Sequence, residues 1–476
     1  MKHEIIGMLN LKKQIQDFIT KFTQEQEIPA KIIEQIHVAG GTVLMVGGAV
    51  RDCLLNQLTE DFDIEVYGLE SQALEKILRQ YGFVQYIGKA FGVYLLPGIN
   101  IDWSLPRIDS VGRKPEVEVN PNLDFETAFR RRDLTINALG INLKTGELVD
   151  PFNGVQDLQN KVLRYVDRDL FTDDPLRFYR VMQFVGRLEM VPDAQLNELC
   201  NEMDLEDVSV ERIEEEFSKL FLKSRNPGLG IKWLQTVGRL YEILPELYAT
   251  IGVPQNPVWH PEGDVFEHIT QALNAAARQE YASDSEKLTI MWAALCHDLG
   301  KVEATKLVDG VWKSTGHALI GVPLAKKLLE RITHNQDLIK AVCKLVRYHM
   351  EPLQFIRNQA GVVAYKRLAI NLYPQTIRLL AKLALADRAG RKAVGQKLPD
   401  KLDFSDDLEL QKFVDQANLA GVWDQMEPPV LQGKDLLDVV KPGPKLGELL
   451  QRAYEIQIQE SILDKSVLKK RVLFSK

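Results

Sequence analysis

The sequence predicts an α/β head, in which a mixed sheet carries helices, followed by all-helical domains to the end of the chain. Between residues 40 and 166, strand patterns alternate with helical patterns, which is typical of an α/β unit. Beyond that point apolar residues recur at helical spacing, for example at Ile213, Phe217 and Leu220. A length of 476 residues allows three or four domains.

The composition is that of an ordinary globular protein, with 45% hydrophobic and 26% charged residues. Because the net charge is −7, any binding of nucleic acid has to rely on local basic patches. No apolar run approaches the ~18 residues of a membrane span, and we see no signal peptide. We therefore expect a cytoplasmic protein with no membrane partner, in which four well-separated cysteines stay reduced: Cys53, Cys200, Cys296 and Cys343.

The N-terminal segment predicts one or two amphipathic helices between Leu9 and Ala39, with a break near Pro29. Ile15, Phe18 and Phe22 fit one face of such a helix. We expect this face to pack against the domain that follows.

A glycine pair follows the first predicted strand. Val43 to Val46 is a short apolar run that predicts a buried strand, and Gly47 and Gly48 end it. Glycines at such a place let backbone N–H groups approach a phosphate closely. A helix from Ala49 to Leu55 would begin there, and Arg51 adds donors that suit a phosphate. The pattern therefore predicts that Gly47, Gly48 and Arg51 bind a nucleotide.

Acidic residues alternate with apolar ones along the next predicted strand. Asp61, Asp63 and Glu65 lie two apart, which gives the strand one acidic face. Carboxylates at this spacing suit a divalent ion such as Mg²⁺. A phosphate cradle beside such a site is what nucleotidyl transfer requires, since two ions activate the attacking hydroxyl and stabilise the leaving pyrophosphate. The alternative interpretation is a turn followed by a solvated acidic face.

This stretch, VGGAVRDCLLNQLTEDFDIEVYG, resembles the class II nucleotidyltransferases, the family of bacterial tRNA CCA-adding enzymes and bacterial poly(A) polymerases. The resemblance implies that Asp61 and Asp63 are the catalytic, Mg²⁺-binding carboxylates. It assigns no role to Glu65.

A further acid lies in INIDWSL, residues 99–105, which predicts a strand that places Asp102 among apolar neighbours. A buried acid needs a partner. Either Asp102 is a third carboxylate near the metal ions, or it pairs with an arginine such as Arg107. The following segment reads as a mobile loop over the site, and the resemblance implies that a loop there reorganises between C and A addition. Three of its residues could take part: Arg107, Asp109 and Arg113.

A basic run, Arg130 to Arg132, precedes Asp133. Three arginines before a helix suit a triphosphate or an RNA backbone, and Asp133 would orient an arginine or a ribose. The alternative is a solvated basic helix face. RRDLTINA matches the second motif of the same family, which implies nucleotide contacts by Arg132, Asp133 and Asn137. The stretch from Asp150 to Gly154, with Asp157 and Arg164, also fits the end of the family's head.

The sequence FTDDPLR, residues 171–177, predicts a helix start, with Asp174 near the N-cap and Pro175 in the first turn. Asp174 and Arg177 then share a helix face and together offer acceptors and donors to a base edge. The alternative is a capping acid with an ordinary salt bridge. The motif resembles the family's nucleotide-selecting EDxxR, with Asp173 in place of Glu. Arg180 and Arg187 continue the arginine series, whereas Gln183 replaces an arginine of many relatives.

Beyond a proline-rich boundary at residues 254–261, histidines and aspartates are spaced along predicted helices. Such ligands suit a divalent transition metal such as Ni²⁺, Mn²⁺, Co²⁺ or Fe²⁺, whose bound water attacks a phosphate ester. Lys301 could face a phosphate. The ordered pattern resembles the HD phosphohydrolase superfamily and implies these ligands: His268, His297, Asp298, His317, His349 and Asp387. We interpret His260 and His334 as ordinary core or surface residues.

The last 79 residues, 398–476, predict a helical tail. The turn PGPKLG, residues 442–447, starts a helix and indicates contact with RNA. The basic ending indicates either such contact or a solvated tail: Lys465, Lys469, Lys470 and Arg471.

We therefore predict N-terminal helices (1–39), a nucleotidyltransferase head (40–166), a helical neck that binds RNA (167–253), an HD domain (254–397) and a helical tail (398–476). The resemblance implies template-independent addition of CMP and AMP, from CTP and ATP, to the 3' acceptor end of tRNA. It also implies phosphatase or 2',3'-cyclic phosphodiesterase activity in the HD domain.

Three alternatives remain open. The first is a sibling enzyme, either a poly(A) polymerase or one that adds only CC or only A. Gly88 to Gly92, GKAFG, lacks the GRRF-like run that we associate with poly(A) polymerases, which favours tRNA. The second is an HD phosphohydrolase whose head only binds RNA, and the third is a non-catalytic RNA-binding protein. The intact pair of Asp61 and Asp63 argues against the second alternative, and two complete sets of metal ligands argue against the third.

Overall fold

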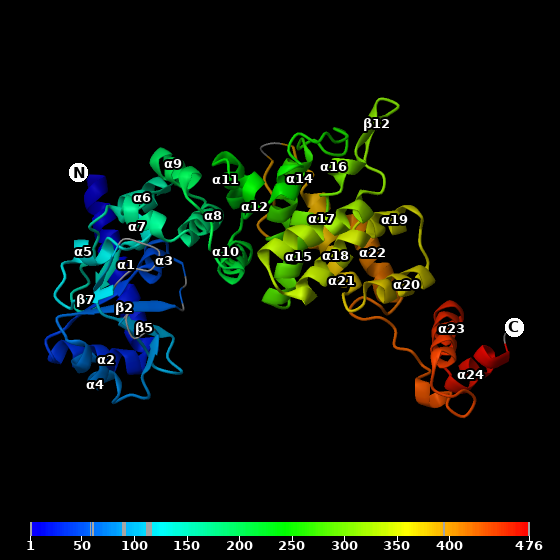
Figure 1. Cartoon of the computed structure of the whole chain (residues 1–476), viewed down its shortest axis with the longest axis horizontal. Helices are drawn as coiled ribbons and strands as arrows, with labels where there is room; N and C mark the ends of the chain where they lie inside the picture. Colours follow the sequence, from blue (N-terminus) through cyan, green and yellow to red (C-terminus); the bar gives the residue numbers. More distant parts are fainter. Residues whose placement is uncertain are drawn as a thin grey trace. The chain divides into compact units, whose positions relative to one another are not determined.

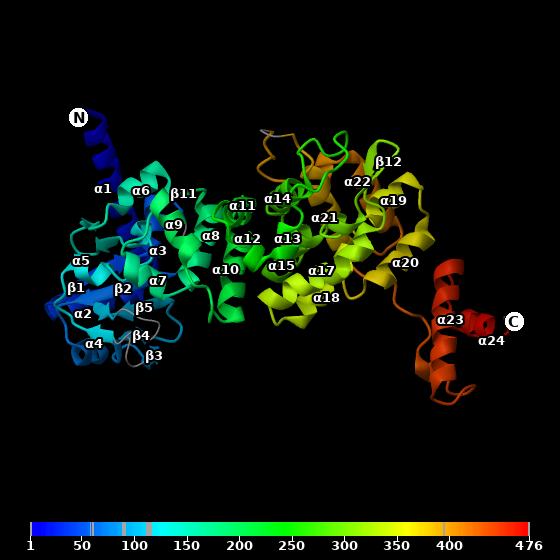
Figure 2. The same ribbon diagram turned by 45° about the horizontal axis from the view of Figure 1, so that its top comes forward.

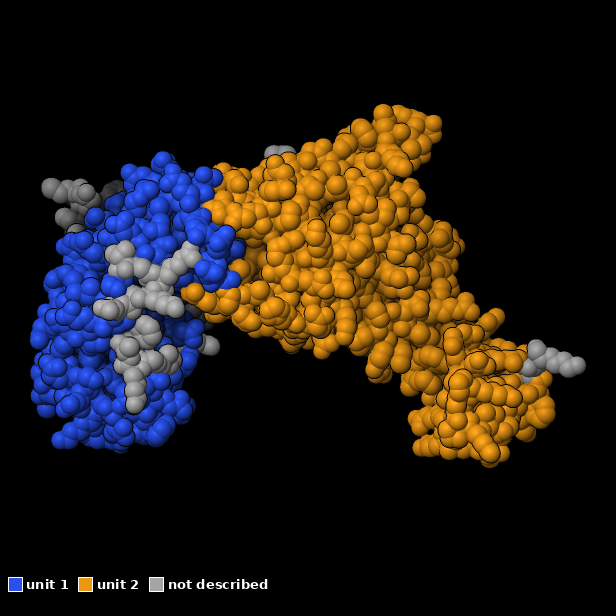
Figure 3. Space-filling model, in the orientation of Figure 1, with its two compact units in different colours: residues 1–208 blue, residues 209–476 orange. Residues whose placement is uncertain are grey.

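A computed structural model of the chain describes residues 2–57, 59, 61–87, 92–110, 117–393 and 396–474, with side chains from Asn10 onward. It contains two compact units, Met1–Val208 and Ser209–Lys476 (Figure 3). The division falls within the predicted neck, and the five predicted domain boundaries stay predictions. Arg113 and residues 88–91 lie outside the described residues.

Unit 1 is built on a seven-stranded sheet with the order β3-β4-β5-β2-β1-β8-β9 (Figure 1). β2 and β5 are parallel, and the other neighbouring pairs are antiparallel, so the sheet is mixed as predicted. The strands are β1 (Thr42–Val46), β2 (Phe62–Tyr67), β3 (Gln85–Ile87), β4 (Val93–Leu95), β5 (Ile101–Ser104), β8 (Gly140–Asn142) and β9 (Leu148–Val149).

Helices and short strands complete unit 1. The helices are α1 (Lys2–Glu25), α2 (Glu27–Val38), α3 (Gly48–Leu54), α4 (Ser71–Leu78), α5 (Phe125–Phe129), α6 (Gly154–Asn160), α7 (Arg168–Asp173), α8 (Leu176–Leu188) and α9 (Ala194–Glu202), with a 3-10 turn, η1, at Thr135–Asn137. Two small pairs lie outside the main sheet: β6 (Arg107–Asp109) with β7 (Val117–Val119), and β10 (Val162–Leu163) with β11 (Val191–Pro192).

The core of unit 1 forms around β1, the most apolar strand. Val43 to Val46 are all at most 1% exposed, as a strand covered on both faces requires. Leu44 and Val46 pack with Phe129 of α5 and Tyr67 of β2. The end of β1 and the start of α3 are therefore held in place by the core, which fixes the glycine turn between them.

The N-terminal helices differ from the prediction in one detail. The break lies at Gln26, between α1 and α2, and Pro29 lies within the first turn of α2. Proline is tolerated in a first turn because its missing N–H would have no acceptor there. Ile15 and Phe22 are buried, so the packing role expected for this segment is confirmed.

Unit 2 is helical except for one hairpin, in the part of it that the structure describes (Figures 1 and 2). Its helices are α10 (Val210–Lys223), α11 (Gly228–Thr236), α12 (Leu240–Ile243), α13 (Pro245–Tyr248), α14 (Val265–Ala276), α15 (Asp284–Cys296), α16 (Lys301–Ala304), α17 (His317–Ile332), α18 (Gln336–Tyr348), α19 (Glu351–Arg357), α20 (Val362–Leu372), α21 (Ile377–Ala389), α22 (Leu408–Leu419), α23 (Pro444–Glu460) and α24 (Lys465–Phe474). The hairpin is β12 (Lys306–Val308) with β13 (Val311–Lys313), and it projects from the helices in Figure 1.

The centre of unit 2 is a bundle in which α14 packs on α21 and α15, and α17 packs on α18. The last two helices, α23 and α24, share a small core of their own that includes Leu436, Ala453 and Leu468. Within the described residues, no helix is long and apolar enough to cross a membrane.

Two candidate active sites

The first site lies where β1 ends and α3 begins. Gly47 has φ +72°, a conformation that favours glycine. A Cβ added there would lie 2.9 Å from Nη1 of Arg132 and 3.4 Å from Oδ2 of Asp63. The absence of a side chain therefore lets a predicted nucleotide-binding arginine and a predicted metal-binding carboxylate approach the same turn.

Three aspartates gather beside this turn. Asp63 of β2 is the register partner of Asp102 on the parallel strand β5, and Asp61 accepts a hydrogen bond of 2.9 Å from Asn100 Nδ2. All three residues are exposed. Desolvation by surrounding protein atoms raises the pKa of Asp102, and the charges of Asp63 and Asp61 raise it further. The negative charges of the three carboxylates therefore interact, and the residues remain exposed to solvent.

The structure shows the surroundings of Asp102, for which two interpretations were open. The expectation that Asp102 is buried was wrong. Asp102 is an exposed residue of β5, and it lies next to the exposed Asp63 near the start of β2. Arg107 pairs with Asp109 at 3.0 Å, and Asp102 forms no ion pair within the described part of the chain. Its position fits a third carboxylate beside Asp61 and Asp63.

These aspartates suit a divalent ion that shares its coordination with a substrate. Among the described residues, groups of three potential ligand atoms within 4.8 Å occur only in unit 2. A looser set is consistent with Mg²⁺, which usually takes one or two protein carboxylates and completes its shell with waters and substrate phosphates.

Glu65, the third acid of the strand, has a different environment. It is fully buried, and its carboxylate accepts from Arg131 Nη2 at 2.9 Å and from the Tyr67 hydroxyl at 2.8 Å. The alternation of β2 thus splits into two exposed aspartates and one buried counter-ion, which holds the basic run 130–132 against the sheet.

Arg51 lies inside the protein. It is 4% exposed, its guanidinium pairs with Asp52 at 2.7 Å, and its Nη1 donates to Asn137 Oδ1. Asp52 also pairs with Arg187 of α8 at 3.1 Å. The guanidinium of Arg51 therefore has two protein partners in this structure, and the phosphate contact expected for it stays a prediction.

Asp133 continues this chain of polar contacts. Its carboxylate accepts from Asn137 Nδ2 at 2.9 Å and from Arg180 Nε at 2.6 Å. Desolvation opposes its charge, yet Arg180 and Arg177 hold the pKa of Asp133 well below its ordinary value. The ionised Asp133 therefore joins η1 to α8. We call this chain the polar chain, made of Arg187, Asp52, Arg51, Asn137, Asp133 and Arg180.

Asp174 and Arg177 begin α8. Asp174 Oδ1 accepts from the N–H of Leu176 at 3.1 Å, which confirms the predicted helix start. Arg177 Nη2 donates to the carbonyl of Arg131 at 2.6 Å, and its Nη1 has no hydrogen-bond partner among the described residues. A buried donor without a partner is costly, so this nitrogen is available to a ligand.

The remaining sequence motifs of unit 1 have structural contacts. Asp150 caps α6, accepting from the N–H groups of Gly154 and Val155. Asp157 accepts from the Thr135 hydroxyl at 2.6 Å and also pairs with Arg164. These contacts hold η1 in place, and with it Asn137 of the polar chain.

The second site lies in unit 2, where the six predicted metal ligands converge. They come from the ends and faces of four long helices and from the turn after α15. All six are buried. Asp298 lies at the centre: its Oδ2 is 3.2 Å from His297 Nε2, and its Oδ1 is 3.2 Å from His317 Nε2. Asp387 Oδ1 lies 3.0 Å from His268 Nε2.

The histidine rings are oriented for a cation. Nδ1 of His297, His317 and His349 lies 2.7 to 2.8 Å from the carbonyl oxygens of Ala294, Ser314 and Val346, respectively. Each Nδ1 therefore carries the proton, and each Nε2 presents a lone pair. Nε2 of His317 lies only 3.0 Å from Nε2 of His349. Two such lone pairs repel unless a cation lies between them, so the donor set fits a metal ion.

The ligand atoms form two groups that share Asp298. His268 and His297 lie on one side of it, and His317 and His349 lie on the other. The structure thus offers two adjacent groups of potential metal ligands, with Asp298 common to both. Apart from the neighbours His297 and Asp298, the ligands are far apart in the sequence, and the structure brings together every residue that the pattern predicted.

Sequence reasoning missed the residues that surround these ligands. A carboxylate oxygen of Glu262 lies 2.7 Å from His268 Nδ1 and 2.8 Å from His260 Nδ1, so His260 adjoins the ligands. Arg391 pairs with Asp387 at 2.7 Å. Glu262 follows His260 by two residues and precedes His268 by six, but that spacing carries no distinctive signal.

Lys301 was predicted to face a phosphate. It is 7% exposed, pairs with Asp298 at 2.7 Å and donates to Gln255 Oε1 at 2.7 Å. In this structure the ammonium group of Lys301 is therefore paired with the carboxylate of Asp298, one of the predicted metal ligands. The ligands adjoin a cavity of about 390 Å³ that reaches Trp259, Trp312 and Arg357.

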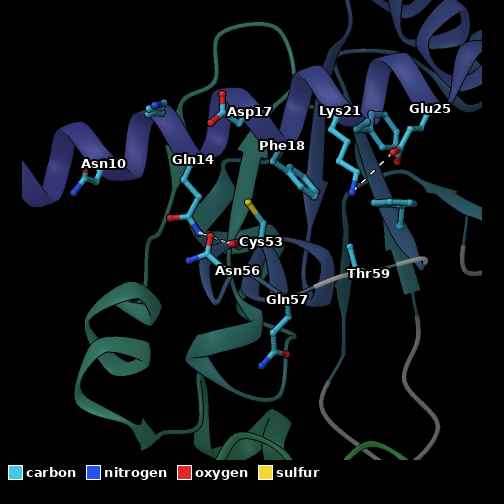
Figure 4. Close-up of a pocket in the computed structure, with 13 residues that line it drawn as sticks. Asn10, Gln14, Asp17, Phe18, Lys21, Glu25, Cys53, Asn56, Gln57 and Thr59 are labelled. Atoms are coloured by element: carbon cyan, nitrogen blue, oxygen red, sulfur yellow. Dashed lines mark hydrogen bonds and ion pairs between the residues drawn. The ribbon is translucent and has the colours of Figure 1, made fainter.

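A further cavity, of about 470 Å³, lies in unit 1 between α1 and the α3–β2 region (Figure 4). Gln14 Nε2 donates across it to the Cys53 carbonyl and to Asn56 Oδ1. Burial raises the pKa of the Cys53 thiol to about 11, so the thiol stays protonated. This cavity is part of the packing of α1 and is separate from the aspartates of the first site.

Three cations of the predicted basic ending form ion pairs with acidic residues of the tail itself. Lys465 pairs with Asp435 at 2.9 Å, Lys469 with Asp438 at 2.7 Å, and Arg471 with Glu460 at 3.0 Å. These pairs favour a structural role for three of the four cations.

Comparisons with known proteins match both sites. Residues 43–164 match the family described as the poly A polymerase head domain, and residues 265–388 match the HD domain. A multifunctional CCA protein from Mannheimia succiniciproducens is 31% identical over 374 residues, covering 76% of this chain and 87% of that protein. One from Pseudomonas syringae is 30% identical over 413 residues, covering 84% and 96%.

Solved structures share the fold. A CCA-adding enzyme from Bacillus stearothermophilus, in complex with CTP, has a TM-score of 0.62 at 18% identity, covering 93% of this chain and 96% of that chain. A CCA-adding enzyme from Thermotoga maritima, complexed with tRNA, has a TM-score of 0.55 at 17% identity, covering 96% and 98%.

The polar chain predicts a stability effect. Replacing Asp133 with Asn removes the charge that balances Arg180 and Arg177, and we expect a loss of about 3 kcal/mol of unfolding free energy. Because the folded-state pKa of Asp133 is depressed, its contribution is present at neutral pH and is lost only as the pH falls through that low value. Urea unfolding of the full chain measures it.

The matched control is Asp124→Asn, at the exposed N-cap of α5, where Asn also caps and the change should stay within about 0.5 kcal/mol. Equal stability of the two variants would contradict the role given to Asp133.

Proposed function

This chain belongs to the family of multifunctional CCA proteins, and on that premise we propose that it adds CMP and AMP, without a template, to the 3' end of tRNA. The family membership confirms the resemblance to class II nucleotidyltransferases with a fused HD domain. The observation that carries the proposal is the group of exposed aspartates, Asp61, Asp63 and Asp102, beside Gly47 and Arg132.

The reaction would take place at these aspartates. Asp61 and Asp63 would hold Mg²⁺, which when bound lowers the barrier by stabilising negative charge on the phosphates. The 3' hydroxyl oxygen of tRNA forms a bond to the α-phosphorus of CTP or ATP, the bond from that phosphorus to the pyrophosphate oxygen breaks, and the hydroxyl proton leaves. Gly47, Gly48 and Arg132 would contact the triphosphate.

The base would be selected at the start of α8. Asp174 offers an acceptor and Arg177 a donor without a protein partner, which together suit the Watson–Crick edge of C or A. Arg51, Asp133, Asn137 and Arg180, which the sequence predicted as nucleotide-binding residues, would act chiefly by holding α8 and the glycine turn in register.

We further propose that unit 2 hydrolyses phosphate esters. His268, His297, Asp298, His317, His349 and Asp387 would hold divalent transition-metal ions such as Ni²⁺, Mn²⁺, Co²⁺ or Fe²⁺. Such ions, when bound, acidify a water molecule so that it attacks phosphorus near neutral pH. Backbone carbonyl oxygens keep His297, His317 and His349 in the Nδ1-protonated form. A phosphatase or 2',3'-cyclic phosphodiesterase activity fits this site.

Loss of the first carboxylates should abolish incorporation. With Asp61→Ala and Asp63→Ala together, we expect incorporation of labelled CMP and AMP into tRNA lacking CCA to fall at least 1,000-fold, about 4 kcal/mol in the barrier. Hydrolysis of 2',3'-cyclic nucleotides by the same protein should not change. Undiminished incorporation would rule out the first site as the polymerase centre.

Loss of the second ligands should have the opposite effect. In His297→Ala and Asp298→Ala variants, and in wild-type protein treated with a chelator and returned to Mg²⁺ alone, we expect hydrolysis to disappear and incorporation to persist. Adding Mn²⁺, Co²⁺ or Ni²⁺ back should restore hydrolysis to the treated wild type only. Metal analysis should show less bound transition metal in the variants, and an unchanged content would contradict the ligand assignment.

A further inference from the structure

Two of the six tryptophans are exposed, and both line the cavity of the second site. Trp259 is 59% exposed and Trp312 is 36% exposed. The other four are buried or half-buried: Trp103, Trp233, Trp292 and Trp423. A large aromatic surface left open to water is unfavourable, and such surfaces commonly mark binding sites.

The two tryptophans come from separate segments. Trp259 lies in the turn at residues 257–259 before α14, and Trp312 lies on β13, opposite Leu307 of β12. The cavity that they line also reaches Asp298, His317 and His349. An aromatic surface and the metal ligands therefore open into one space.

The positive charges of the cavity divide into two kinds. Lys301 pairs with Asp298 and Arg391 with Asp387, each at 2.7 Å. Lys313 and Arg357 are exposed and form no ion pair within the described residues. The second two cations are therefore available to an anion that enters from solvent.

We propose that this cavity recognises the nucleobase of its substrate, with Trp259 and Trp312 as the stacking surface and Lys313 and Arg357 as phosphate contacts. Hydrolysis needs only a phosphate at the ligand cluster, so the aromatic surface serves selection. Every base offers a π-face, and stacking on an aromatic side chain is worth about 1–3 kcal/mol per base. A volume of about 390 Å³ lies within the range of small-molecule sites.

The new assignment is that Trp259 and Trp312 make the site select a phosphate ester that carries a base over one that does not. This inference rests on the proposed hydrolase activity of unit 2 for its kinetic readout, whereas base binding is measured independently. The kinetic test compares adenosine 2',3'-cyclic phosphate with glycerol 1,2-cyclic phosphate, which has the same cyclic diester and no base. In both, a water oxygen bonds to phosphorus, one ester P–O bond breaks, and the released oxygen takes the proton.

With the full chain and Mn²⁺, Trp259→Ala and Trp312→Ala should each raise KM for the adenosine ester about 5- to 150-fold, the range that stacking energies give. KM for the glycerol ester should not change. Arg357→Ala should raise KM for both esters. Matched controls are Val258→Ala and Leu307→Ala, exposed neighbours of the tryptophans that do not line the cavity, and they should behave as wild type.

Equilibrium dialysis with labelled adenosine 2',3'-cyclic phosphate separates the two proposals. Weaker binding in both tryptophan variants, with no hydrolysis in wild type, would keep the base site and overturn the hydrolase proposal. Hydrolysis of both esters with equal KM in wild type, or unchanged KM and binding in the tryptophan variants, would overturn the base site. No binding and no hydrolysis in wild type would overturn both.

Discussion

The polar chain, the row of six contacting side chains that begins at Arg187 and ends at Arg180, is the constraint on which unit 1 depends. Its buried charges, Arg51, Asp52 and Asp133, depend on one another and on the half-buried Arg180 and Arg187, because removing one partner leaves a charge in the interior without compensation. The set joins α3, η1 and α8, which are separated by up to 135 residues in the sequence. Since Arg177 and Asp174 start α8, the same contacts position the proposed base-selecting residues against the glycine turn.

Unit 2 meets a related constraint with a different solution. It gathers four histidines and two aspartates in its interior, and it fixes each ring through Nδ1 so that the Nε2 atoms face one another. Such an arrangement is unfavourable without a cation and favourable with one. The two units therefore use buried polar groups in different ways: the polar chain of unit 1 is satisfied by protein partners, and the ligand cluster of unit 2 would be completed by the proposed ion.

The sequence predicted the parts of the sites that depend on local pattern. The strand before Gly47, the alternation through Asp61 and Asp63 and the helix start at Asp174 each lie within a short stretch. The ligands of unit 2 are spread from His268 to Asp387, and it was their resemblance to a known family that implied them. The contacts that the sequence did not predict join residues that are far apart in the chain. Nothing in the sequence near Arg51 indicates Asn137 as its partner, and nothing near Glu65 indicates Arg131. The phosphate contact expected for Arg51 stays a prediction. The exposure of Asp102 follows from the pairing of β5 with β2, which strand pattern alone does not specify.

The most direct test of the account is nucleotide incorporation by the purified protein with Mg²⁺, on tRNA ending before CCA, after C and after CC, and on an unrelated oligo(A) RNA. Each acceptor is offered labelled CTP or ATP. The account predicts two additions of C followed by one of A, on tRNA only. Long A tails on any RNA, or addition that stops at CC or begins only after CC, would contradict it.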